Sequence, residues 1–184
     1  RVVVRVFAGW DFNSEDALAP DIAAVGYGRG VPMGSVLRQG PPGVAPRFLI
    51  AAARDSAGAN LDRIQVVKGW LESDGSTSER IYNVSWSGDR SLDTAGRLLP
   101  LVSTVHVDTA SWSNSIGEPQ LSTVWQDPDF DPDEGVFYYV RVLEIPTPRW
   151  TAYDALRFGV TLPPEVPMVT QERAYTSPIW YMAD

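Results

Sequence analysis

The chain has 184 residues, of which 44% are hydrophobic and 21% charged, so its composition is that of a folded globular protein and excludes a disordered one. Its 15 basic and 23 acidic residues give a net charge of −8, which argues against nucleic acid and anionic membrane surfaces as partners. The chain has no cysteine, which excludes disulfides, thiolate metal sites and cysteine nucleophiles but leaves the cellular compartment open.

Runs of β-branched and aromatic residues predict a chain made mainly of strands. The run at 135–144 is the clearest, and we expect it to be central because apolar residues fall on both of its faces. In 61–71, Ile64, Val66 and Trp70 alternate with Arg63 and Gln65, which is typical of a half-buried strand. In chain order the expected strands cover residues 2–7, 47–53, 61–71, 80–86, 102–112, 121–125, 135–144 and 176–181.

Two short helices are predicted. Asp21 can cap a helix over 22–27, and a second helix over 149–158 would end at Gly159. In the second helix Trp150, Tyr153 and Arg157 share one side, so we expect it to pack as a surface helix on a sheet and to offer a contact surface. No apolar run approaches the ~18 residues of a membrane span.

Short strands, regular turn signals and few helices together predict an antiparallel β-sandwich of the jelly-roll or immunoglobulin-like kind. The length fits one domain over residues 1–184, and such a domain buries roughly 70% of the surface of its unfolded chain. The sequence starts inside a strand pattern, so we expect further residues before Arg1. Nothing in the sequence indicates an oligomeric state.

Several long strings are specific enough to carry a resemblance. They are ANLDRIQVVKGW at 59–70, DPDFDP at 127–132, FYYVRVLEIPTPRW at 137–150 and QERAYTSPIWY at 171–181. The chain resembles the C-terminal region of the bacterial domain-of-unknown-function family 3604, whose longer members resemble PHP-type metal-dependent hydrolases. The resemblance implies a β-sandwich appended to an upstream α/β barrel that holds a divalent metal. The His-x-His and Asp-x-His pairs of such a metal site are absent here, so no metal ligand transfers to this chain.

Candidate sites within the chain are few. His106 is the only histidine, so neither a zinc site of the usual composition nor a Ser-His-Asp triad is indicated, and we predict a half-exposed strand histidine. The alternating carboxylates of an acidic loop raise the hypothesis of a calcium site, although two prolines favour a stiff acidic loop without metal. These carboxylates belong to Asp127, Asp129, Asp131 and Asp133.

The aromatic residues allow a further hypothesis. Seven Trp and seven Tyr are compatible with sugar binding, but most of the Trp residues fall in or beside predicted strands and are expected in the core. These are Trp10, Trp70, Trp86, Trp112, Trp125 and Trp180. We therefore expect no catalytic or cofactor-binding residue in this chain. The favoured hypothesis is a noncatalytic accessory domain that packs on an upstream hydrolase domain through its first strand and the Trp150 helix. The alternative is an independent module that binds a carbohydrate or another small ligand.

Overall fold

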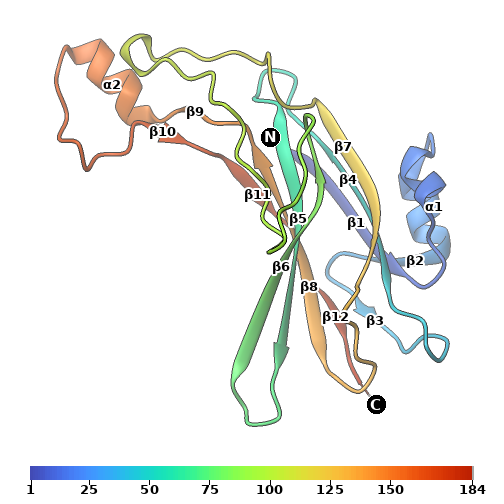
Figure 1. Cartoon of the computed structure of the whole chain (residues 1–184). Coiled ribbons are helices and arrows are strands. Elements are labelled where there is room, and N and C mark those ends of the chain that lie inside the picture. Colours follow the sequence, from blue (N-terminus) through green and yellow to red (C-terminus); the bar gives the residue numbers. More distant parts are fainter. Residues whose placement is uncertain (184) are drawn as a thin grey trace.

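The computed structural model describes residues 1–183 and is mainly β, with two sheets that face each other as in a β-sandwich (Figure 1). Apart from one parallel pair, the strand pairs are antiparallel. The smaller sheet has the order β2 (Gly30–Pro32), β1 (Val3–Gly9), β4 (Arg47–Ala53) and β7 (Gln120–Gln126). The predicted antiparallel sandwich is therefore confirmed at the level of fold class.

The larger sheet is built around β8 (Val136–Glu144), as its apolar residues on both faces predict. Its strand order is β3 (Val36–Leu37), β12 (Ile179–Tyr181), β8, β5 (Leu61–Leu71) and β6 (Thr77–Trp86). The short β11 (Arg173–Tyr175) also pairs with β8, so β8 is joined to three strands. β3 and β12 form the parallel pair.

The core lies between the two sheets, where alternate residues of each strand point inward. Among its aromatic pairs, Phe48 of β4 and Tyr138 of β8 lie closest to each other, with ring centroids 4.6 Å apart. Trp10, Trp70 and Trp125, which were expected in the core, are only half-buried and pack against its margin. Trp180 is a correction to the prediction, since 44% of its surface is exposed on the outer side of β12.

A second, smaller cluster covers part of the outer face of the four-stranded sheet. There the one-turn helix η1 (Ser14–Leu18) and α1 (Ile22–Arg29) pack on Phe7 and Leu49. Asp21 caps α1 as predicted, because its side chain accepts a hydrogen bond from the Ala24 N–H. Gly26 lets α1 lie against the Phe7 ring, where any Cβ atom would collide.

Two elements differ from the prediction. Residues 102–112 form no strand: they belong to the long connection between β6 and β7, with one short helical turn, η2 (Val107–Thr109), and one bridge between His106 and Ser111. The valines there find no sheet partner, and Val102 is 85% exposed. β5 is buried on both faces rather than on one, because Asp62, Gln65 and Lys68 are also enclosed.

The second helix, α2 (Trp150–Phe158), also lies elsewhere than expected. It ends at Gly159 in the left-handed conformation, as predicted, but it packs on neither sheet of the sandwich. Instead it contacts η2 and the short pair β9 (Thr147–Pro148) and β10 (Val169–Thr170). Together these segments form an arm that projects from the body of the molecule (Figure 1).

Candidate interaction surfaces and a buried ion-pair network

The projecting arm is held together by a few specific bonds. The Arg149 N–H donates to the Met168 carbonyl at 2.9 Å, and the Thr151 hydroxyl donates to the Pro167 carbonyl. Thr151 and Ala152 are the buried residues of α2, so its inner side faces η2 and the segment that returns to β10. These bonds give α2 one fixed side and leave its other side to solvent.

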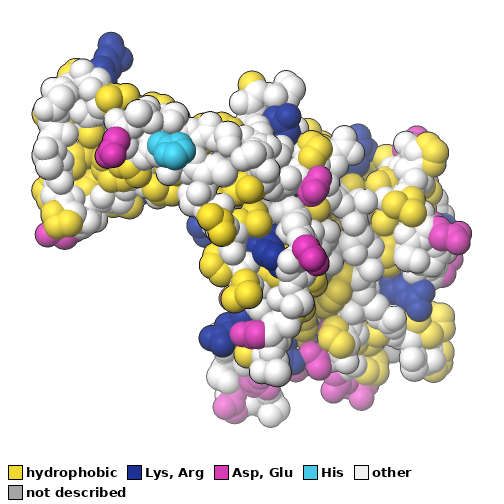
Figure 2. Space-filling model, turned by 45° about the horizontal axis from the view of Figure 1, so that its top comes forward, with side chains coloured by type: hydrophobic (Ala, Val, Ile, Leu, Met, Phe, Trp, Pro, Cys, Tyr) yellow, Lys and Arg dark blue, Asp and Glu magenta, His cyan; other side chains and the backbone are white. Residues whose placement is uncertain are grey.

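The solvent side of the arm is rich in large apolar groups, and Figure 2 shows hydrophobic side chains over much of this lobe. We call the following six residues the arm surface: Trp150, Tyr153, Leu156, Arg157, Phe158 and Val160. Trp150 is 64% and Phe158 66% exposed, and the Arg157 guanidinium lies 5.8 Å from the Phe158 ring centre. Apolar groups gathered so densely on a surface typically mark a binding site.

The three residues predicted to offer a contact surface therefore lie together on the arm. Trp150, Tyr153 and Arg157 are all exposed and follow one another along α2. Beside them lies a hollow of about 440 Å³, bordered by η2, α2 and the segment that follows α2. Its lining is mostly apolar and includes Val107, Leu156 and Leu162. His106, at the start of η2, is exposed and belongs to no strand.

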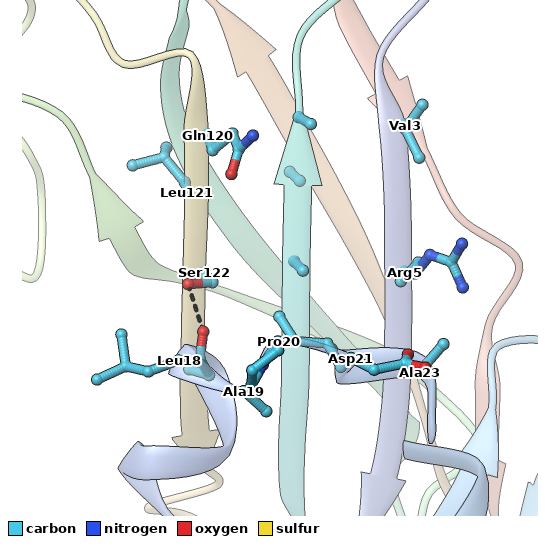
Figure 3. Close-up of a pocket in the computed structure, with 15 residues that line it drawn as sticks. Val3, Arg5, Leu18, Ala19, Pro20, Asp21, Ala23, Gln120, Leu121 and Ser122 are labelled. Carbon is cyan, nitrogen blue, oxygen red and sulfur yellow. Dashed lines mark hydrogen bonds between the residues drawn. The ribbon is translucent and has the colours of Figure 1, made fainter. Parts of the chain in front are cut away.

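A second hollow lies over the first strand, on the outer face of the four-stranded sheet (Figure 3). Its volume is about 550 Å³, and its floor consists of the short side chains of Ala51 and Ala53 between Val3 and Ser122. The turn between η1 and α1 forms its wall, tied to β7 by a 2.9 Å hydrogen bond from the Ser122 hydroxyl to the Ala17 carbonyl. Arg5 is the only cationic group among its lining residues.

The acidic segment after β7 does not gather its carboxylates around one point. Asp127 is buried and Asp129 exposed, and both pair with cations, whereas the exposed Asp131 accepts a hydrogen bond from the Asp133 N–H at 2.9 Å. Within residues 1–183 no three side chains of His, Asp or Glu lie close enough to hold a metal ion. Asp127 and Asp131 thus accept hydrogen bonds within their own turns, and Asp127 and Asp129 form ion pairs with residues of the larger sheet.

Asp127 forms a buried network with Lys68 and Tyr138. The Lys68 Nζ lies 2.9 Å from the Asp127 carboxylate, and both side chains are at least 97% buried. The Tyr138 hydroxyl donates to the same carboxylate at 2.7 Å, and Lys68 also donates to the Asp129 carbonyl at 2.7 Å. Because Lys68 and Tyr138 lie in the larger sheet and Asp127 directly follows β7, the network links the two sheets.

An exposed extension of this network lies on β6. Asp129 accepts from Arg80 at 2.6 Å and from the Tyr82 hydroxyl at 2.8 Å. The Tyr82 and Arg80 contacts lower the pKa of the Asp129 carboxyl. The sequence reasoning overlooked this arrangement, although the single lysine of the chain, set in the apolar run of β5, was its available signal.

Replacing Tyr138 by Phe should change how stability responds to alkaline pH. Burial, followed by the charge of Asp127, raises the pKa of Tyr138 well above 10. Above about pH 10 the unfolded chain loses this proton while the folded chain keeps it, so stability falls with rising pH by up to about 1.4 kcal/mol per pH unit. Urea unfolding between pH 7 and 11 should show a shallower decline for Tyr138→Phe, and equal slopes would contradict this assignment.

At pH 7 the same variant should lose about 1–3 kcal/mol, because Asp127 loses a donor that water cannot replace. Tyr82→Phe provides a control on the exposed side of the network, where solvent can replace the lost hydrogen bond.

In the part of the chain that the structure describes, no helix has the length and apolar character needed to cross a bilayer. The fold and surfaces define the class of protein: a β-sandwich with an enclosed ion-pair network and a projecting, apolar helical arm. The chain belongs to the family described as "Protein of unknown function (DUF3604)", which matches residues 1–183. No curated protein and no solved structure matched the chain.

Proposed function

We propose that this chain is a noncatalytic accessory domain that packs, through the arm surface, on a metal-dependent hydrolase domain of the same polypeptide. The observation that supports the proposal best is the exposure of large apolar groups on an arm that projects from the sandwich. A folded monomer rarely leaves such groups together in water, because their burial stabilises by roughly 25 cal/mol per Å².

The size of the arm surface favours a partner domain in the same chain over a second copy of the protein. A stable interface between separate proteins uses about 20–30 residues on each side, far more than the six of the arm surface. A domain joined by a linker is present at a high effective concentration, so a smaller patch is sufficient to hold it. Contacts between domains of one chain are also commonly of this modest extent.

The hydrolase part of the proposal comes from the resemblance of the longer family members to PHP-type enzymes. In such a pair, the barrel would hold the divalent metal and the sandwich would support the rim of the substrate site. The first strand supplies a second surface, since Val3 is 57% exposed and lines the hollow over the Ala51 and Ala53 floor.

The test uses the longer polypeptide that contains both the hydrolase-like domain and this sandwich, beside the sandwich alone. We expect the amide hydrogens of the first turn of α2 to exchange at least tenfold more slowly in the longer polypeptide. Replacing Trp150 and Phe158 by Asp should abolish that protection, because the buried interface would then hold two charges. Leu71→Asp is the matched control, since Leu71 is 61% exposed at the far end of β5.

Metal content and phosphoester hydrolysis of the two proteins test the second half of the proposal. Bound metal and turnover in the longer polypeptide alone are expected. Turnover in the sandwich alone, or equal exchange of α2 in both proteins, would overturn the accessory role. A longer polypeptide without metal or turnover would overturn the hydrolase partner.

A further inference from the structure

The outer face of the larger sheet carries polar and aromatic rows that the proposed function does not use. The register of β6, β5, β8 and β11 aligns outward side chains in rows across the strands. One row contains Asn83, Gln65, Arg141 and Tyr175, and beside it Arg63, Leu143 and Arg173 form a second row. This face is distinct from the arm surface and from the hollow over β1.

The first row is a chain of hydrogen bonds that fixes the position of Arg141. The Gln65 side-chain N–H donates to Asn83 at 2.8 Å, and the Arg141 Nε donates to Gln65 at 2.8 Å. Asn83 is held in turn by the Gly96 carbonyl at 3.0 Å. The Arg141 guanidinium is thereby held at its Nε, on a strand that pairs with β11.

Three guanidinium groups, those of Arg63, Arg141 and Arg173, gather on this face although the whole chain has a net charge of −8, and one carboxylate, that of Glu79, lies opposite Gly69 beside the aromatic rings. Arg63 pairs with the buried Asp62, but within residues 1–183 neither Arg141 nor Arg173 has a carboxylate at ion-pair distance. Arg173 and then Arg141 lower the pKa of the Tyr175 hydroxyl, and the strand register sets Tyr175 opposite Arg141, two residues from Arg173 on β11. Two uncompensated guanidiniums in fixed positions can bind a carboxylate or a sulfate.

An aromatic strip adjoins these cations. Tyr175 lies 6.3 Å from Tyr139, Tyr139 lies 6.4 Å from Phe137, and Phe137 lies 5.1 Å from Trp180, measured between ring centroids. Gly69 is opposite Phe137 on β5, and any side chain there would collide with the Phe137 ring. The Phe137 ring thus lies against β5 at Gly69, and the two ends of the strip are open to solvent, with Tyr175 57% and Trp180 44% exposed.

A short hairpin bounds the face on the β6 side. Leu92 and Leu98 form a bridge, and the hairpin tip closes a hollow of about 270 Å³ over Arg63, Gln65 and Asn83. The face therefore has a wall, a polar floor and an aromatic strip that leads away from it.

We propose that this face binds an acidic polysaccharide, whose sugar rings pack on the Tyr175, Tyr139 and Trp180 rings while Arg141 and Arg173 hold its carboxylates or sulfates. Flat apolar rings beside a few fixed polar groups suit pyranose rings, which have an apolar face and a polar rim. A peptide that binds a sheet usually adds a strand at an edge, whereas the rings and cations here belong to the face.

Affinity electrophoresis of the 184-residue chain in gels with and without polygalacturonate tests the proposal, with sulfated dextran and neutral dextran in parallel gels. We expect the uronate or the sulfated polymer to retard the protein and neutral dextran not to do so. Arg141→Gln with Arg173→Gln should weaken binding at least tenfold, and Tyr175→Ala should weaken it by a similar factor. Arg5→Gln and Tyr27→Ala, exposed residues on the other sheet and α1, should leave binding unchanged.

The exposed Arg173 and Tyr175 can also be replaced singly, so that a loss of folding in the Arg141 variant does not decide the outcome. Retardation by uronate shows the carboxylate as the bound group, and retardation by the sulfated polymer alone shows the sulfate. Several outcomes would overturn the proposal: no retardation by either polymer, equal retardation by poly-glutamate, or binding that survives Tyr175→Ala and therefore reflects charge alone.

Discussion

Replacing Lys68 by Met should destabilise the fold by about 3–5 kcal/mol, because it leaves the Asp127 carboxylate without its cation in a site closed to water. The Asp127 side chain has no exposed surface, and its remaining partners are the Tyr138 hydroxyl and the Asp129 N–H. Met has nearly the length of the lysine stem, so the loss reflects charge more than packing. Equilibrium unfolding in urea at pH 7 measures the difference.

Two comparisons separate burial from charge. Arg80→Met removes the partner of Asp129 from a pair that is about half exposed on each side, so it should cost less than about 1 kcal/mol. Adding Asp127→Asn to Lys68→Met should restore most of the lost stability, because Asn is neutral and can still accept from Tyr138. If Lys68→Met costs no more than Arg80→Met, the buried pair does not hold the sheets together.

The sequence predicts the framework of the sandwich well, because the central strands are long and each is paired with another strand on both of its edges. The structure has β4 and β5 within the predicted bounds, and β8 begins one residue later than predicted. The caps of α1 and α2 follow from single residues, Asp21 and Gly159, whose conformational preferences depend on little else.

The sequence does not reveal which segments pair with a sheet edge or pack on a sheet. Val105 and Val107 are spaced like residues on one face of a strand, yet the chain there crosses to α2 and back without meeting a sheet edge. The helix over 150–158 has an apolar side that predicts packing on a sheet, but its position depends on β9, β10 and η2, which are too short to be recognised from local patterns.

The candidate surfaces were predictable only in part. Trp150, Tyr153 and Arg157 share a side of α2, so their common surface follows from helical spacing. The row from Asn83 to Tyr175 joins residues from four strands and depends on strand register, including a bulge between Ile64 and Gln65. A one-residue change in that register would turn Gln65 to the core, and no local pattern fixes it.

Replacing Asp62 by Ala should have an effect as large as the loss of Lys68, about 3–5 kcal/mol. Asp62 is 1% exposed and holds two groups from distant parts of the chain together with its neighbour Arg63. Arg90 donates to its Oδ1 at 2.7 Å, Gln171 donates to its Oδ2 at 2.8 Å, and Arg63 pairs with the same Oδ2. Without the carboxylate, the Arg90 guanidinium, which is 9% exposed, is enclosed without a counter-charge.

The loss should also loosen the segment after β6, because Arg90 attaches it to the Asp62 carboxylate, whereas the bonds of Ser87 to the Asp62 main-chain carbonyl remain. Amide exchange over residues 87–99 should therefore accelerate in Asp62→Ala more than exchange in β4. Arg97→Ala is the control from the same hairpin: its pair with Asp93 is 82% exposed on the arginine side, so its loss should cost less than about 1 kcal/mol. Equal costs for the two variants would mean that solvent reaches Asp62, and its role as the anchor of this segment would be lost.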